Sequence, residues 1–294
     1  MLVKYLGDIV IQSGHFVIEG ISPVSFEKHL NQYGIFKFDN FEELSEYAYS
    51  KWPSPTEKEI ELLNNREEAD SSDSFLDYLN FYNNIASSEV LRSTILSEKY
   101  GAYEKCAETI ISVLNKPKKI LDIGCNIGYL TTWYARNFTK SVIHGIDNSI
   151  KSIQYANKMK NKMNVENVHF NVIDFNFMKF PNHSFDVIID TQSIYYASNP
   201  KKAFSSIKDL ITNNGVFITI PGIGDLEGIK QYLNDIQQAG FIISRFDFIE
   251  CENIGVAEFY PFIIADLNSE LIELKVEEKF NKIKSSMSVV ISGA

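Results

Sequence analysis

Residues 119–128, KILDIGCNIG, join an apolar segment to a glycine turn, and the interpretation of the whole chain starts there. The apolar run over 119–123 stands between Pro117 and Gly124 and predicts a buried strand. Glycine lets the backbone turn tightly and approach a ligand without a Cβ atom in the way. The helix predicted over 127–137 would present free backbone N–H groups to that ligand.

Strand and helix patterns alternate along the rest of the chain. We predict strands over 119–124, 141–147, 168–174, 185–191, 216–220, 241–249 and 287–291, and helices over 127–137, 149–162, 200–211 and 227–239. Such alternation is typical of βαβ units, which build a mostly parallel sheet covered on both faces. We therefore expect a doubly wound α/β fold that binds its ligand at the carboxyl ends of the strands.

The segment before Pro117 has a different pattern. Apolar runs around Ser13 and Gly14 predict a hairpin, and Thr56 begins a capping box that predicts a short helix. Helical spacing continues from Phe75 and again over 103–114. We expect two regions, with the bounds 1–97 for an accessory or lid region and 98–294 for the ligand-binding domain.

Residues 250–285 are interpreted as an insertion before the last strand. They include an aromatic cluster over 259–262, Phe-Tyr-Pro-Phe, beside an expected turn. Such a segment suits a substrate cover, a packed appendage or a dimer interface, and the sequence leaves these three open.

Composition argues against several classes of protein. The 294 residues carry a formal net charge of −10, which repels nucleic acid because its binding depends on Lys and Arg meeting phosphates. The three cysteines form no CxxC pair, which favours a reducing compartment and predicts no metal site. No apolar run is long enough to span a membrane, and the N-terminus lacks a signal-peptide pattern. We expect a cytoplasmic protein.

The glycine turn lacks the G-x-G-x-x-G spacing of a dinucleotide site. Asp122 stands two residues before Gly124, where a carboxylate would repel a pyrophosphate and attract a cation. S-adenosylmethionine carries a sulfonium and an ammonium group and has no phosphate. The electrostatics of this turn therefore favour S-adenosylmethionine over a nicotinamide dinucleotide.

Two further predicted strands also end in aspartate. Asp147 ends the second strand, where an acidic side chain can accept hydrogen bonds from ribose hydroxyls, and Asp174 with Phe175 ends the third. Each aspartate alone also suits a turn or a helix cap. Three successive strands that end in aspartate make that alternative weaker for the set.

These features together resemble the class I S-adenosylmethionine-dependent methyltransferases, from about Glu98 to Asp247. The segments that carry the resemblance are LDIGCNIG (121–128), HGIDNS (144–149), VIDFNFMKFPNHSFDVIIDTQSIYY (172–196) and LITNNGVFITI (210–220). The resemblance implies a seven-stranded sheet with a reversed last strand, and MSVVISGA (287–294) suits that strand. Asn126 departs from the family because a glycine is more usual at its position.

The resemblance also implies roles for residues in the cofactor site. Asp147 would hold both ribose hydroxyls, Asn148 would lie near the adenine, Asp174 would bind the adenine amino group, and Phe175 would contribute its backbone N–H. The full predicted cofactor set is Asp122, Gly124, Cys125, Asn126, Gly128, Asp147, Asn148, Asp174, Phe175 and Gln192.

The acceptor is less well defined by the sequence. Methyltransferases that act on planar amino groups of adenine or glutamine resemble one another in having a [DN]-P-P-[YF] motif after the fourth strand. Residues 190–193 of this chain lack that motif. Tyr195 and Tyr196 either line the acceptor site or pack at a helix start. No histidine receives a catalytic role, and methyl transfer from a sulfonium depends chiefly on positioning.

We therefore expect methyl transfer to a nitrogen or oxygen atom of a small molecule, with natural-product biosynthesis as one setting. A protein or RNA methyltransferase and a binding protein that keeps the fold without catalysis stay open. A nicotinamide oxidoreductase is disfavoured by the glycine spacing and by Asp122.

Overall fold

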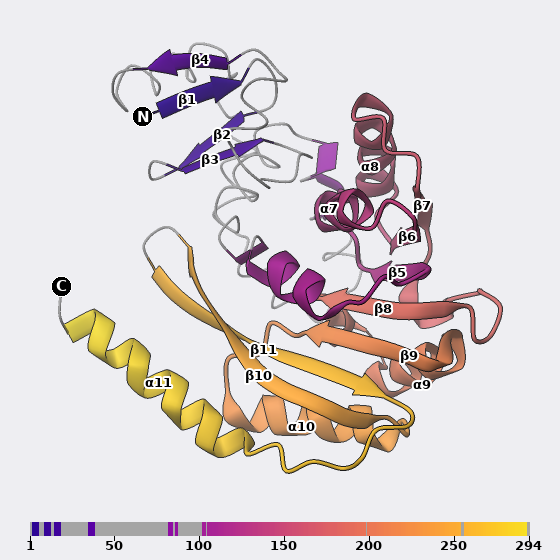
Figure 1. The fold of residues 1–294 in the computed structure, drawn as a ribbon, viewed down its shortest axis with the longest axis vertical. Coiled ribbons are helices and arrows are strands. Elements are labelled where there is room, and N and C mark those ends of the chain that lie inside the picture. Colours follow the sequence, from indigo (N-terminus) through magenta and orange to yellow (C-terminus); the bar gives the residue numbers. More distant parts are fainter. Residues whose placement is uncertain are drawn as a thin grey trace.

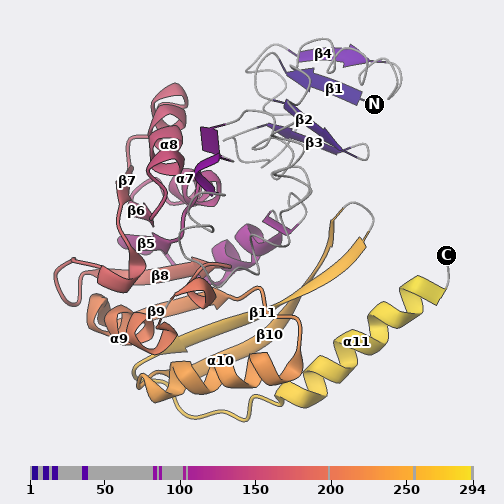
Figure 2. The ribbon, with the colours of Figure 1, turned by 180° about the vertical axis from the view of Figure 1, so that it is seen from behind.

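The structure is a computed structural model that describes residues 2–5, 9–12, 15–18, 35–38, 82–84, 86–87, 102–103, 105–197, 199–253 and 256–292. Figures 1 and 2 show a central twisted sheet with helices packed along it. The C-terminal helix lies beside the sheet edge formed by the last two strands. The expected α/β class is confirmed.

Seven strands form the main sheet in the order β10-β11-β9-β8-β5-β6-β7. Their bounds are β5 (Lys119–Ile123), β6 (Val142–Asp147), β7 (Val168–Val172), β8 (Phe185–Thr191), β9 (Ile211–Ile220), β10 (Ile242–Asn253) and β11 (Val256–Asp266). Strands β5 to β9 pair in parallel, whereas β11 runs antiparallel to both of its neighbours. After β7 the chain returns to the other side of β5, so strand order reverses between β5 and β8. Ligands of open α/β sheets bind at such a switch point.

The helices lie on both faces of this sheet. They are residues 102–103 and 105–113, α7 (Tyr129–Asn137), α8 (Ile150–Lys162), α9 (Pro200–Leu210), α10 (Leu226–Gln238) and α11 (Val276–Ser292). Gly240 follows α10 with a φ of +90°, the left-handed conformation that ends many helices. The predicted elements between residues 103 and 249 are observed, with shifted ends.

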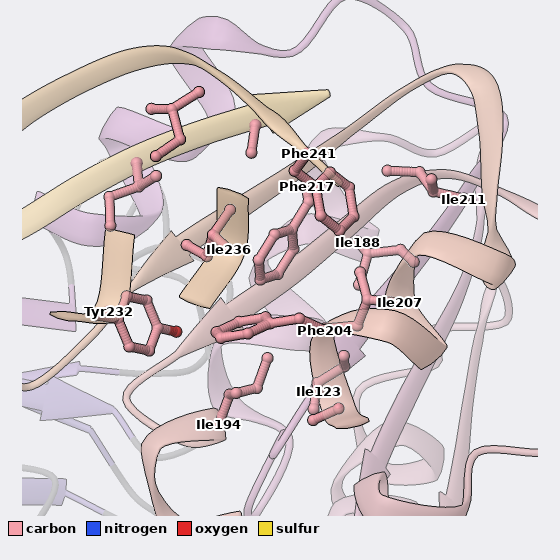
Figure 3. Packing of buried hydrophobic residues seen from close by; sticks show 14 of the residues in the cluster. Ile123, Ile188, Ile194, Phe204, Ile207, Ile211, Phe217, Tyr232, Ile236 and Phe241 are labelled. Atoms are coloured by element: carbon pink, nitrogen blue, oxygen red, sulfur yellow. The ribbon is translucent and has the colours of Figure 1, made fainter. Parts of the chain in front are cut away.

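Successive residues of the central strands point to opposite faces of the sheet and contribute to two hydrophobic cores. Ile120, Ile189 and Ile218 pack with residues of 102–110 and α7 on one face. On the other face, Leu121, Ile123, Ile188 and Phe217 pack with α9 and α10. Figure 3 shows Phe204, Phe217 and Phe241 gathered in this second core. Alternation with a period of two buries both faces of the central strands.

One strand prediction is wrong. The reversed strand is β11, whereas residues 287–291 lie in α11. The aromatic cluster 259–262 belongs to β11, so residues 250–285 are not an insertion before the last strand. Pro261 obscured this strand because proline cannot donate to a strand ladder. It is tolerated because β11 pairs with β9 only over 263–265, beyond the proline.

The N-terminal region contains two small antiparallel pairs. Strand β1 (Leu2–Tyr5) pairs with β4 (Ile35–Phe38). Strand β2 (Ile9–Gln12) pairs with β3 (His15–Ile18), which confirms the predicted hairpin around Ser13 and Gly14.

Other N-terminal predictions are tested only in part. The helix predicted from Thr56 lies outside the described residues. Of the helix predicted from Phe75, residues 82–84 and 86–87 are described and are helical. The lid role of 1–97 and the boundary at residue 98 stay predictions. Among the described residues, no helix has the length and apolarity needed to cross a bilayer.

Phe217→Ala tests the second core. Phe217 is fully buried, and its ring centroid lies 6.0 Å from that of Phe204 and 5.7 Å from that of Phe241. Removing the ring should lower the free energy of unfolding by about 3–5 kcal/mol because it leaves a cavity. Urea denaturation measures this loss. Val142→Ala is the control, because Val142 is 42% exposed and should cost less than about 1 kcal/mol. Equal losses would contradict the packing described.

Candidate functional site

The turns that follow β5 and β8 touch at the switch point. Gly124 has a φ of +66°, and a Cβ atom on it would lie 2.2 Å from the Ser193 Cβ. The Ser193 hydroxyl donates a hydrogen bond to the Ile123 carbonyl at 2.9 Å. Only glycine combines this left-handed conformation with so close an approach. The glycine is therefore required by the packing of the two turns, whatever ligand the site holds.

Asn126 also has a left-handed backbone, with a φ of +48°. Asparagine tolerates this conformation better than most residues, which explains how it replaces the usual glycine. Its backbone N–H donates to Asp147 Oδ2 at 2.8 Å, and its side-chain Oδ1 accepts from the Ser152 hydroxyl at 3.1 Å. Asn126 thus links the glycine turn to β6 and to α8.

Asp147 lies at the carboxyl end of β6. Its Oδ2 accepts the Asn126 N–H, and its Oδ1 accepts the Ser149 N–H, each at 2.8 Å. Burial raises the pKa of Asp147, and these N–H groups oppose the rise. Each carboxylate oxygen has a second lone pair. The group is held in one orientation and can still accept hydrogen bonds from two hydroxyls.

The neighbouring Asn148 has a buried side-chain amide, and neither its nitrogen nor its oxygen has a hydrogen-bond partner among the described residues. Buried polar groups in folded proteins are nearly always hydrogen-bonded. An amide that needs both a donor and an acceptor is suited to a purine edge, which offers both. This residue therefore fits the role that the family resemblance implies for it.

Asp122 lies beneath the glycine turn and is 3% exposed. The Thr131 hydroxyl of α7 donates to its Oδ2 at 2.5 Å. Burial raises the pKa of Asp122 to about 7, and the negative charges of Asp190 and Asp147 add to the rise. Asp122 thus connects β5 to α7. Its predicted electrostatic attraction for a cationic ligand would act from beneath the turn.

Other residues of the glycine turn serve packing. The Cys125 side chain lies in the first core, and its N–H donates to the Ile146 carbonyl at 2.9 Å. Burial raises the pKa of the Cys125 thiol. Gly128 has a φ of +79°, and a Cβ there would lie 2.6 Å from the Phe170 ring. Neither residue presents a side chain to a ligand.

Asp190 precedes Thr191, the last residue of β8, and its side chain holds neighbouring elements together. It is fully buried, and its Oδ1 accepts the N–H groups of Ser193 at 3.1 Å and Ile194 at 2.9 Å. Its Oδ2 accepts the Thr219 hydroxyl at 2.7 Å, and the Tyr232 hydroxyl lies 2.8 Å from that of Thr219. This network fixes the turn after β8 to β9 and α10.

The residues that follow β8 lie at the carboxyl ends of the parallel strands. Gln192 has a φ of +57° and is half-buried. Tyr195 and Tyr196 lie in a short 3-10 helix, η2 (Ile194–Tyr196), with ring centroids 4.1 Å apart. A Cβ on Gly222 would lie 3.0 Å from the Tyr195 hydroxyl. The two tyrosines are half-buried, and Tyr195 packs against the loop after β9.

Asp174 and Phe175 follow β7, at the same edge of the sheet. Phe175 begins η1 (Phe175–Phe177), and its side chain is buried in the second core. The Asp174 carbonyl accepts the Phe177 N–H at 2.8 Å, and the Asp174 residue is half-buried. The topology therefore brings all ten predicted cofactor residues to the carboxyl ends of β5, β6, β7 and β8.

Sequence reasoning missed Asn83. The Ser149 hydroxyl donates to Asn83 Oδ1 at 2.8 Å, and Ser149 also caps α8 by accepting the Ser152 N–H. Ser149 is recognisable as a helix cap, but no local signal connects it to a residue 66 positions earlier. The contact places part of the N-terminal region beside Asp147.

His144 on β6 and His169 on β7 contribute packing. The rings of His144 and His169 lie 5.3 Å apart, and His144 also packs against Phe185. Burial lowers the pKa of His144 to about 4. Within the described ranges, no group of three or more His, Cys, Asp or Glu side chains is arranged to hold a metal ion.

Asp122→Asn should reduce the pH dependence of stability. The pKa of Asp122 is raised to about 7 in the folded chain, against about 4 in an unfolded one. Its contribution is therefore present below pH 4 and is lost as the pH rises through 7. Urea denaturation at pH 5 and pH 8 should show a smaller loss of stability in the variant than in the unmodified protein. Equal losses of stability in the two proteins would contradict the raised pKa of the buried Asp122 carboxyl. Asp209→Asn is the control, because Asp209 is exposed.

Residues 114–254 match a family model described as a methyltransferase domain. Phosphoethanolamine N-methyltransferase 3 of Arabidopsis thaliana is 30% identical over 142 residues, which cover 46% of this chain and 28% of that protein. Sterol 24-C-methyltransferase ERG6A of Gibberella zeae is 32% identical over 118 residues, which cover 40% and 30%. The chain thus spans less than a third of the length of these two curated relatives.

A solved structure from Methanococcus maripaludis, described as an S-adenosyl-L-methionine-dependent methyltransferase, has the same fold. It superposes with a TM-score of 0.51 at 18% identity, over 66% of this chain and 95% of that one. The family match, the strand order and the glycine turn together identify residues 114–254 as a methyltransferase domain of the class I, S-adenosylmethionine-dependent family.

Proposed function

We propose that this chain transfers the methyl group of S-adenosylmethionine to a nitrogen or oxygen atom of a small molecule. The cofactor follows from the family. The observation that carries the proposal is the pair Asp147 and Asn148 beside the switch point. A carboxylate oriented by two N–H groups stands next to a buried amide that has no hydrogen-bond partner in the described part of the chain, and this pair suits an adenosyl group.

Each predicted residue has a task in this proposal. Asp147 would accept hydrogen bonds from the ribose hydroxyls, and Asn148 with Asp174 would contact the adenine. The Gly124 turn would admit the amino-acid part of the cofactor close to the backbone. Asp122, from below, would add negative charge that favours the cationic ligand.

The bound cofactor would supply an activated methyl group on a sulfonium. The protein's task would be to align the acceptor with the methyl–sulfur bond and to exclude water, since positioning accounts for much of such acceleration. Gln192, Tyr195 and Tyr196, after β8, lie where the acceptor would enter, beside the loop that follows β9.

The relatives' names support a small acceptor. One names phosphoethanolamine and the other a sterol, although their acceptor atoms differ, nitrogen in one and carbon in the other. The net charge of −10 disfavours a nucleic-acid acceptor. We also propose a cytoplasmic location, which the three free cysteines support.

Two alternatives predict different results. A protein or RNA methyltransferase would modify macromolecules but not small molecules in an extract incubated with methyl-labelled cofactor. A binding protein that keeps the fold would bind the cofactor without turnover.

Calorimetric titration is the first test of the proposal. The protein should bind S-adenosylmethionine and S-adenosylhomocysteine with micromolar affinity and should not bind NAD, because the glycine turn lacks the G-x-G-x-x-G spacing of a dinucleotide site. A folded sample, verified by circular dichroism, that binds neither adenosyl compound would overturn the proposal. Binding of NAD alone would point to an oxidoreductase instead.

Asp147→Ala should weaken binding of S-adenosylmethionine by about 1–3 kcal/mol, the usual loss when hydrogen bonds to a charged group are removed. The same calorimetric titration measures the change. Asp209→Ala is the control, because Asp209 lies exposed on α9, and its affinity should match that of the unmodified protein. An unchanged affinity in folded Asp147→Ala would show that the carboxylate does not hold the ribose.

A further inference from the structure

The turn after β8 fixes the position of the glycine turn after β5. The Ser193 hydroxyl lies 2.9 Å from the Ile123 carbonyl, directly before Gly124, and donates to it. A Cβ atom on Gly124 would lie 2.2 Å from the Ser193 Cβ, so the two turns touch. Ser193 is itself only 5% exposed. Any movement of Ser193 would therefore move the backbone of the glycine turn.

Ser193 is held in place by Asp190. Oδ1 of this carboxylate accepts the N–H groups of Ser193 at 3.1 Å and Ile194 at 2.9 Å, and the Ser193 hydroxyl lies within hydrogen-bonding distance of the same oxygen. Burial raises the pKa of Asp190, while these N–H groups lower it and favour the charged form. A buried carboxylate is thus bonded to the turn after β8 from beneath.

The other oxygen of Asp190 leads away from the site. Oδ2 accepts the Thr219 hydroxyl of β9 at 2.7 Å, and Thr219 opposes Asp190 in the ladder of β8 and β9. The Tyr232 hydroxyl of α10 lies 2.8 Å from that of Thr219 and 3.3 Å from Oδ2. The Tyr232 ring packs edge-on against that of Phe204, with centroids 5.3 Å apart (Figure 3). Because Thr219 and Tyr232 are also buried, a polar chain runs through the second core from α10 to the turn.

The Ser193 hydroxyl has one proton but two acceptors, the Ile123 carbonyl and Asp190 Oδ1. A charged acceptor attracts a proton more strongly than a carbonyl does. Each hydrogen bond that Asp190 accepts from another donor reduces this attraction, because that donor neutralises part of the negative charge. The Thr219 hydroxyl, polarised by that of Tyr232, therefore leaves Ser193 able to hold the Ile123 carbonyl.

We propose that Thr219 and Tyr232 are positioning residues for the cofactor. They act through Asp190 and Ser193 to fix the Gly124 turn, and they contact no ligand themselves. This inference rests on the proposed function, in which that turn receives the amino-acid part of S-adenosylmethionine. The affinity for the cofactor is then set in part by hydroxyl groups inside the second core.

Calorimetric titration of S-adenosylmethionine into variants of the full chain tests the proposal. Thr219→Val keeps the shape of the side chain and removes the hydroxyl. It should weaken binding by about 3- to 10-fold, the effect of one lost hydrogen bond. Thr219→Ser keeps the hydroxyl and should recover most of this loss. Tyr232→Phe should weaken binding less than Thr219→Val, because the Tyr232 hydroxyl lies further from Asp190 than that of Thr219 does.

A double variant tests whether Thr219 acts through Ser193. Ser193→Ala alone should weaken binding at least as much as Thr219→Val does. When the two substitutions are combined, the affinity should equal that of Ser193→Ala, because the hydroxyl through which Thr219 acts is already gone. Effects that multiply in the double variant would overturn the proposal.

Ile236→Val separates positioning from a general loss of stability. Ile236 is fully buried on α10, four residues after Tyr232, and is no part of the polar chain. Its midpoint of urea denaturation should fall, as expected for a shortened core side chain, while its affinity for S-adenosylmethionine stays unchanged. If Ile236→Val lost as much affinity as Thr219→Val, stability alone would explain both losses and the proposal would be wrong.

Methylthioadenosine is the second probe, because it has the adenosyl group but lacks the amino-acid part. Thr219→Val should bind it as tightly as the unmodified protein does, since the proposed contacts of Asp147 and Asn148 with the adenosyl group lie outside the polar chain. Equal weakening for methylthioadenosine and S-adenosylmethionine would contradict an action on the Gly124 turn.

The outcomes distinguish this inference from the proposed function. Failure of the unmodified protein to bind S-adenosylmethionine would overturn the proposed function itself. Binding by the unmodified protein, together with full affinity in Thr219→Val and Ser193→Ala samples that circular dichroism shows to be folded, would overturn the positioning role and leave the proposed function standing.

Discussion

The candidate site depends on one carboxylate, that of Asp147, held by two backbone N–H groups. One belongs to Asn126 in the turn after β5, and the other to Ser149 at the start of α8. Through Ser149 and its contact with Asn83, the same carboxylate is connected to the N-terminal region. Three segments far apart in the sequence are thereby connected to one carboxylate. A ligand that contacts Asp147 would therefore affect the position of all three segments.

Negative charge at the switch point is costly in the absence of a cation. Asp122 and Asp190 lie in opposite cores, beneath neighbouring turns, and together with Asp147 each has a pKa raised by burial. Asp190 is satisfied by its hydrogen bonds, whereas the Asp122 side chain accepts one hydrogen bond from the described residues, that of the Thr131 hydroxyl. A cationic ligand would relieve this repulsion, and local conflicts of this kind are expected at functional sites.

Local signals in the sequence predicted the strands and turns that carry the candidate cofactor residues. The turn from Gly124 to Gly128 and the aspartates that end strands are recognisable because strand, turn and helix follow one another directly. Strand β11 was missed because Pro261 resembles a strand breaker, and only its place beyond the ladder with β9 makes it tolerable. The contact of Asn83 with Ser149 joins residues 66 positions apart, and no local pattern encodes it.

The reversed direction of β11 sets it apart from the parallel strands that carry the candidate cofactor residues. The carboxyl ends of the parallel strands lie at the proposed cofactor site, so the residues there serve the cofactor whichever acceptor is used. An antiparallel strand brings its amino-terminal half to the same edge, where it can extend without disturbing the cofactor turns. Glu258 and Tyr260 lie in that half. Changes in the hairpin would then leave Asp147 and the glycine turn as they are.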